Sequence, residues 1–147
     1  MSFRSVFLAC ACSLAVGLLA ADLVRTSAED KAPPAKQGVY ELRVYKTLEG
    51  RLPALEARFR DHTMGLFEKH GMKNVMYWTP TDDEKSKNTL IYVLWHESED
   101  AAKKSWDGFR NDPDWTAARD ASEKDGKIVA GVEATYMKET EWSPKHH

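Results

Sequence analysis

The stretch at residues 89–97 constrains the fold more than any other part of the chain. Its centre is an unbroken apolar run that consists of Leu90, Ile91, Tyr92, Val93, Leu94 and Trp95. A run of this length, rich in β-branched and aromatic residues, predicts a strand. Because successive side chains of a strand point to opposite sides of its sheet, both sides of this strand are apolar. Other parts of the structure therefore have to cover both sides.

Hydrophobic periodicity divides the rest of the domain into strands and helices. Alternation with a period of two predicts strands, and apolar residues at steps of three and four predict helices. The predicted elements, in chain order, are a strand at 39–47, a helix at 51–70, strands at 72–79 and 89–97, a helical region at 98–126 that restarts at Asp112 and Pro113, and a strand at 128–137. This β-α-β-β-α-β order is the ferredoxin-like pattern of an α+β domain, in which two helices cover one face of an antiparallel sheet.

Two helices leave the second face of such a sheet uncovered. That face would carry apolar side chains from residues 89–97, and from 72–79, where Val75, Met76, Tyr77 and Trp78 are apolar on both sides. An exposed apolar patch of this kind marks an interface. We expect a second copy of the chain to cover it, because two-fold homodimers are the commonest soluble oligomers. The alternative is that the terminal segments fold over this face, but their polar composition disfavours it.

The first 28 residues differ from the rest of the chain. Arg4 precedes a run without charge at residues 5–21, and small residues follow at Ala20, Ala21, Ser27 and Ala28. This pattern predicts a signal peptide at 1–28 and an exported protein, either secreted or periplasmic. The alternative is an uncleaved N-terminal membrane anchor. After signal removal we expect no membrane association.

The remaining segments divide into a linker, a domain and a tail. Residues 29–37 contain two adjacent prolines and no periodicity, which predicts a solvated linker. The domain itself extends over residues 38–138, and the polar residues 139–147 are predicted to form a mobile tail. Both cysteines, Cys10 and Cys12, lie in the predicted signal. The mature protein would therefore have no disulfide and no thiol chemistry.

Charge and motif content exclude several classes of function. The net charge is −2, and the basic residues are spread along the chain without a basic stripe, so no nucleic-acid partner is expected. No histidine pair has the spacing of a metal site, and no glycine-rich phosphate loop is present. We therefore predict neither a metal nor a cofactor.

Four residues are candidates for a ligand site. Glu41, Arg43 and Tyr45 form a polar row on one face of the first strand, so Arg43 could hold an anion in a cavity enclosed by the dimer. The alternative is an ion pair, interchain or cross-strand, that fixes the register of the dimer. His62 lies on the apolar stripe of the first helix and could point between helix and sheet, where it could bind haem iron or another metal. A histidine at the edge of the core, hydrogen-bonded to the backbone, is the structural alternative.

Several segments resemble the NIPSNAP family. They are VYELRVY at 39–45, LFEKHGM at 66–72, YW at 77–78 and WDGFRNDPDW at 106–115. The resemblance implies a dimeric α+β barrel, a superfamily that includes small oxygenases, haem-degrading enzymes and stress-responsive dimers. The family itself has no settled reaction. We therefore expect an exported homodimer that binds a small molecule or a protein partner, with a small oxygenase or haem-degrading type of enzyme as the alternative.

The signal-peptide pattern makes a direct prediction about the mature chain. Intact-mass analysis of the exported protein should give a mature N-terminus between Ala21 and Glu29, and therefore a chain without cysteine. Exported material that retains Cys10 and Cys12 would contradict this and would favour the N-terminal anchor.

Overall fold

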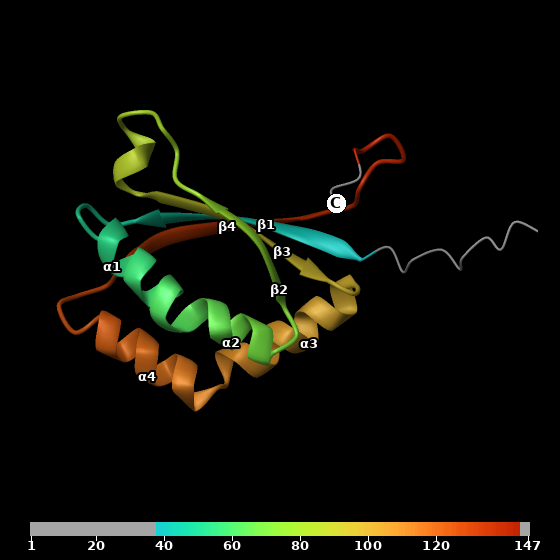
Figure 1. Ribbon diagram of the computed structural model, residues 1–147. Coiled ribbons are helices and arrows are strands. Elements are labelled where there is room, and N and C mark those ends of the chain that lie inside the picture. The colour runs from blue at the N-terminus through green and yellow to red at the C-terminus, as the bar shows by residue number, and fades with distance from the viewer. Residues whose placement is uncertain (1–37, 145–147) are drawn as a thin grey trace, which may run out of the picture. The chain divides into compact units, whose positions relative to one another are not determined.

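The computed structural model describes residues 38–144 (Figure 1). The predicted signal peptide at 1–28 and the linker at 29–37 lie outside these residues, as does the end of the tail at 145–147. None of the helices within residues 38–144 has the length and apolar character needed to cross a membrane.

The strands form one antiparallel sheet in the order β2-β3-β1-β4. Their bounds are Val39–Thr47 for β1, Lys73–Trp78 for β2, Thr89–His96 for β3 and Val129–Met137 for β4. The apolar strand β3 lies inside the sheet, paired with both β1 and β2. This order and the helices on one side confirm the predicted ferredoxin-like α+β fold.

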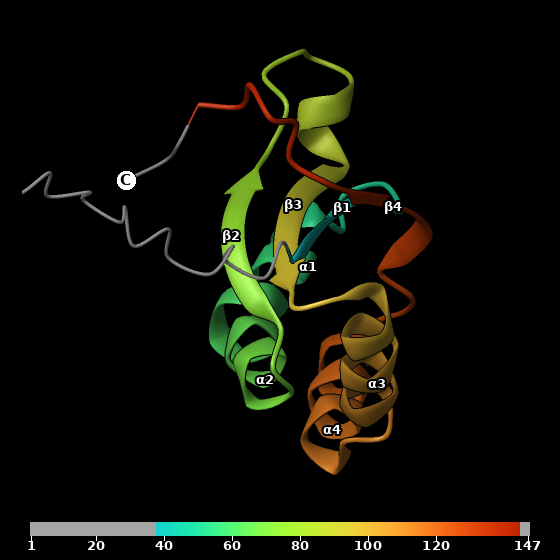
Figure 2. The same cartoon turned by 90° about the vertical axis from the view of Figure 1, so that its right-hand side faces the viewer.

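The helices all lie on one side of the sheet, as Figures 1 and 2 show. The first helical region consists of α1 (Leu52–Arg58), a π-helical turn η1 (Phe59–Thr63) and α2 (Met64–Lys69). The second consists of α3 (Glu99–Arg110) and α4 (Pro113–Ser122). A short 3₁₀ turn, η2 (Lys85–Lys87), lies in the connection between β2 and β3.

Side-chain caps fix the start of both helices in the second region. Ser98 caps α3, and the Asp112 carboxylate accepts a hydrogen bond of 2.9 Å from the backbone N–H of Asp114 at the start of α4. The same carboxylate lies 2.8 Å from Lys69 Nζ and 2.6 Å from His70 Nε2. Asp112 thus joins the end of α2 to the beginning of α4.

The core lies between the sheet and the helices and is largely aromatic. Phe59, Phe67, Tyr92, Trp106 and Phe109 are buried there, and neighbouring rings pack at centroid distances between 4.9 and 6.0 Å. Tilted and edge-to-face arrangements of this kind favour the electrostatics of the rings as well as burying large areas. Few large residues therefore suffice to build the core of a small domain.

The opposite face of the sheet is apolar and is not covered by helices. The strand registers place on it Leu42, Val44, Met76, Trp78, Ile91, Val93, Trp95 and Met137, which we call the open face. Met76 and Trp78 are 51% and 47% exposed. The predicted two-sided apolar character of β3 is confirmed, since Tyr92 and Leu94 are fully buried on the helix side.

The π-helical turn corrects one prediction made from the sequence. The backbone N–H of Met64 bonds to the carbonyl of Phe59, a step of five residues that accommodates one residue more than an α-helical turn. The inward positions therefore continue from Phe59 to Thr63, which is buried, while His62 is exposed. The prediction that His62 points toward the sheet is wrong, because it assumed an unbroken period of 3.6.

Candidate functional site

The buried carboxylate of Glu41 is the centre of a cluster of polar side chains between the sheet and the helices. Glu41 on β1 is 2% exposed, and its Oε1 accepts a hydrogen bond of 2.6 Å from Arg43 Nη1. Its Oε2 accepts one of 2.7 Å from Trp106 Nε1 of α3 and lies 2.9 Å from His96 Nε2 at the end of β3. Three elements thus converge on one carboxylate, which we call the Glu41 network.

The hydrogen bonds of this network decide the charge state of Glu41. Burial alone would raise the pKa of the carboxyl group, because it disfavours the charged form. The hydrogen bonds from His96, Trp106 and Arg43 outweigh burial and hold the pKa of Glu41 below its ordinary value. The carboxylate is therefore ionised at neutral pH and balances the charge of Arg43.

Arg43 is held from a second side by aromatic rings. Its guanidinium carbon lies 4.2 Å from the centroid of the Trp106 ring and 5.7 Å from that of Tyr45. Ion pairing with Glu41 is one of the two roles predicted for this residue, although the pair lies within one strand. We predicted that Glu41, Arg43 and Tyr45 line a cavity enclosed by a dimer. That prediction is wrong about the side of the sheet, because the three side chains face the helices of their own chain.

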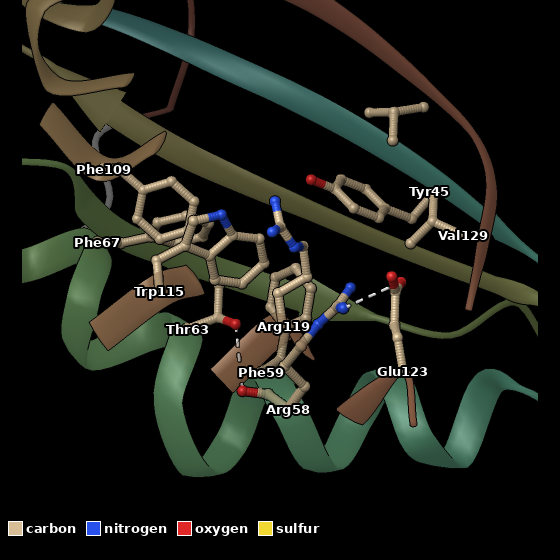
Figure 3. Close-up of a pocket in the computed structure, with 11 residues that line it drawn as sticks. Tyr45, Arg58, Phe59, Thr63, Phe67, Phe109, Trp115, Arg119, Glu123 and Val129 are labelled. Atoms are coloured by element: carbon tan, nitrogen blue, oxygen red, sulfur yellow. Dashed lines mark hydrogen bonds and ion pairs between the residues drawn. The ribbon is translucent and has the colours of Figure 1, made fainter. Parts of the chain in front are cut away.

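A cavity of about 230 Å³ lies next to this network, between the sheet and the helices (Figure 3). Its aromatic walls are Tyr45, Phe59, Phe67, Phe109 and Trp115. Its charged lining residues are Arg58, Arg119 and Glu123, and Thr63, Val129 and Val132 complete the lining. We call this space the helix-side cavity.

Arg58 is the buried charge of the helix-side cavity. The residue is 4% exposed, and its Nη1 donates hydrogen bonds to Ser122 Oγ at 3.2 Å and to Glu123 Oε1 at 3.4 Å. Its guanidinium carbon lies 5.2 Å from the centroid of the Trp115 ring. Burial lowers the pKa of the Arg58 guanidinium, and the Glu123 carboxylate acts against this effect.

The π-helical turn positions the cavity-lining part of the first helical region. Arg58 immediately precedes the turn, Phe59 begins it and Thr63 ends it. The Thr63 hydroxyl donates a hydrogen bond of 3.1 Å to the Arg58 carbonyl oxygen. Two cavity residues, Phe59 and Thr63, thus lie within one local irregularity of the backbone, next to Arg58 at the end of α1.

The structure brings together three of the four residues proposed from the sequence. Glu41 and Arg43 belong to the buried network, and Tyr45 extends from β1 into the adjacent cavity (Figure 3). His62 lies apart, in a surface depression between α1 and α4 with Asp61 and Ala118. No cluster of three or more histidine, cysteine or acidic side chains that could hold a metal occurs within residues 38–144.

Sequence reasoning did not find Arg58, His96 or Glu123. Arg58 follows the core residue Leu55 by three positions, so the helical period places this charged residue on the buried side of the helix. That pattern could have identified it. His96 follows the buried Leu94 by two positions on the same face of β3. Glu123 lies at the end of α4, and its sequence context carries no comparable signal.

The domain is thus ferredoxin-like, with an antiparallel sheet in the order β2-β3-β1-β4. Between this sheet and the helices lies a cavity of ligand size, lined by charged and aromatic side chains. The chain belongs to the NIPSNAP family, because the model of that family matches residues 40–144. Comparison with curated proteins gives no match.

Solved structures of the same fold are distant in sequence. A NIPSNAP family protein of unknown function from Agrobacterium tumefaciens is 21% identical, covers 74% of this chain and 94% of its own, and has a TM-score of 0.62. A NIPSNAP-like domain protein from Burkholderia xenovorans is 11% identical, with coverages of 76% and 92% and a TM-score of 0.63. SnoaB, a cofactor-independent oxygenase from Streptomyces nogalater, is 13% identical, with coverages of 74% and 99% and a TM-score of 0.51. At these identities the likeness concerns the fold.

The Glu41 network predicts a large loss of stability when its carboxylate is removed. Glu41→Gln should lower the free energy of unfolding at pH 7 by about 3 kcal/mol, because it leaves the largely buried Arg43 without its counter-charge. The pKa of Glu41 is held low in the folded state, so its contribution is full above about 4.5, the ordinary value of a glutamate, and is lost as the pH falls further. Urea unfolding at pH 7 and at lower pH measures both effects.

A matched control and a double variant separate the network from a general effect of the substitution. Glu84→Gln makes the same change at an exposed position in the connection between β2 and β3 and should leave stability within about 0.5 kcal/mol. Glu41→Gln combined with Arg43→Met should cost less than the sum of the single variants, because the pair is then removed together. Additive costs would show that Glu41 and Arg43 do not depend on each other.

Proposed function

We propose that this NIPSNAP domain binds a small molecule in the helix-side cavity and works as an exported homodimer. The observation that carries the proposal is a ligand-sized cavity with Arg58 buried in its aromatic lining. An apolar cavity of about 150 Å³ in another protein is large enough to take up benzene. The helix-side cavity, at about 230 Å³, has room for a compound of one or two rings.

The side chains around the cavity favour binding over catalysis. A general base for neutral pH requires a group whose pKa lies near that pH. Burial raises the pKa of the Tyr92 hydroxyl, next to the Tyr45 ring, well above its ordinary value, so it stays protonated. The lining contains no histidine, and its one carboxylate, Glu123, is engaged with Arg58. The lining therefore offers groups that hold an anion and a ring, and offers no free histidine or carboxylate as a general base.

A pair of matched aromatic compounds tests the binding function. We expect 2-naphthoate, 2-naphthamide or both to bind the purified domain in isothermal titration calorimetry, with one site per chain. Val132→Trp should weaken binding by about tenfold or more, because the larger side chain enters the cavity at its exposed edge, where Val132 is 42% exposed. Leu48→Trp is the control, since Leu48 is 44% exposed in a turn outside the cavity. If neither compound binds, or if both variants bind like the wild type, the cavity is not a ligand site.

The open face supports the proposal of a homodimer. Large apolar side chains such as Met76 and Trp78 are about half exposed on it, and helices cover only the other side of the sheet. Burying such side chains stabilises an association by roughly 25 cal/mol for each Å² of apolar area removed from water. A second copy, packed sheet against sheet, would supply this burial.

A single charge on the open face should separate the two copies. Met76→Glu should shift the molecular mass measured by analytical ultracentrifugation from dimer to monomer, because a carboxylate would have to be desolvated in the interface. The protomer should remain folded by circular dichroism, since Met76 is 51% exposed within it. Leu48→Glu, at an apolar position of similar exposure away from this face, should remain dimeric. A wild-type domain that sediments as a monomer at micromolar concentration would refute the proposal.

A further inference from the structure

The charge balance of the helix-side cavity points to a particular class of ligand. We infer that the cavity takes a small aromatic carboxylate, with the Arg58 guanidinium binding the carboxylate and the aromatic walls binding the ring. This inference rests on the proposed binding function and adds the chemistry of the ligand. Its evidence comes from the ion pairs, the unpaired donors and the walls of the cavity.

Arg58 is less closely paired with its carboxylate than Arg43, which is more exposed. The distance from Arg58 Nη1 to Glu123 Oε1 is 3.4 Å, whereas that from Arg43 Nη1 to Glu41 Oε1 is 2.6 Å. Charge-assisted hydrogen bonds between arginine and carboxylate are usually about 2.7–2.9 Å long. The buried charge of Arg58 is therefore only partly compensated within the described chain.

A second guanidinium increases this imbalance. Arg119 also lines the cavity, and its positive charge acts with burial to lower the pKa of Arg58. The only carboxylate in the lining is Glu123, while Arg119 has its own exposed partner in Asp120, 2.9 Å away. The lining itself thus contains two guanidinium groups and one carboxylate; since Asp120 balances Arg119 from outside the lining, an anionic ligand would compensate Arg58.

Buried donors without partners lie around the same space. Within residues 38–144, Arg58 Nε and the Tyr92 hydroxyl are fully buried and have no hydrogen-bond partner. The Tyr92 ring packs against two cavity walls, at centroid distances of 5.1 Å from Phe59 and 5.5 Å from Tyr45. A buried polar group without a partner costs free energy. The region is therefore short of acceptors, and a carboxylate contributes acceptors only.

The walls define the other half of the ligand. Phe109 and Trp115 pack together at a centroid distance of 4.6 Å, and Phe59 and Phe67 continue the apolar lining. Such flat faces favour a planar ring, which can pack against them in tilted or edge-to-face arrangements. Since Arg58 also lies over Trp115, a ring bound against these walls would have its carboxylate near the guanidinium.

The experiment compares a charged compound with its neutral isostere. In calorimetry, 2-naphthoate should bind the wild-type domain about tenfold or more tightly than 2-naphthamide, because a hydrogen bond to a charged group is stronger than one to a neutral group. Glu123→Gln should increase the affinity for 2-naphthoate, since it removes the carboxylate that competes for Arg58. Arg58→Met combined with Glu123→Gln should abolish the preference without leaving an unpaired buried charge.

Further variants make the result specific to Arg58. Arg58→Lys, which keeps the charge but loses the planar fork, should keep part of the preference. Arg60→Met, at an exposed arginine two positions away that pairs with Asp61, should keep all of it. Equal binding of the two compounds, or a preference that survives the Arg58→Met and Glu123→Gln double change, would overturn the inference and leave the binding function standing. No binding of either compound would overturn both.

Discussion

The Glu41 carboxylate has to be buried with its charge, and much of the arrangement of the domain follows from this requirement. A buried anion is tolerated only where donors converge on it, and here they come from β1, from the end of β3 and from α3. These contacts fix the register of β1 against β3 and the place of α3 above them. A slip of one residue along β1 would move Glu41 to the open face and leave His96 and Trp106 without their acceptor.

The fold could be predicted from the sequence because it depends on hydrophobic periodicity. The sequence did not predict which face of β1 is buried, because individual contacts with distant residues determine that. Alternation along β1 predicted a strand with two distinct faces, but alternation does not say which face meets the helices. The apolar set Tyr40, Leu42 and Val44 would be the usual choice for the core, yet the Glu41 side is buried because Trp106 and His96 supply its donors. Those partners are more than fifty residues away in the chain.

The residues of the helix-side cavity also divide into those that periodicity could predict and those that only contacts in the folded chain bring together. Tyr45 could be proposed from the strand pattern, and it does line the cavity. Arg58 and Glu123 come from different helical regions, and only the folded packing of α1 against the end of α4 brings them into contact. The cavity and the open face lie on opposite sides of the sheet. The proposed ligand binding and the proposed self-association would therefore use separate surfaces of one protomer, and each could be altered without removing residues of the other.

The π-helical turn also bears on how members of this family should be compared. A step of five residues in place of four accommodates one extra residue in the helix, so a chain that lacks this residue can continue as a regular α-helix across the same span. In an alignment the difference would be a single-residue gap between positions 58 and 64. Beyond the gap, residues aligned by number alone would be rotated by about 100° around the helix axis. Such a gap would thus separate chains that keep Thr63 at the pocket wall from chains that turn the corresponding residue away, even where overall identity is the same.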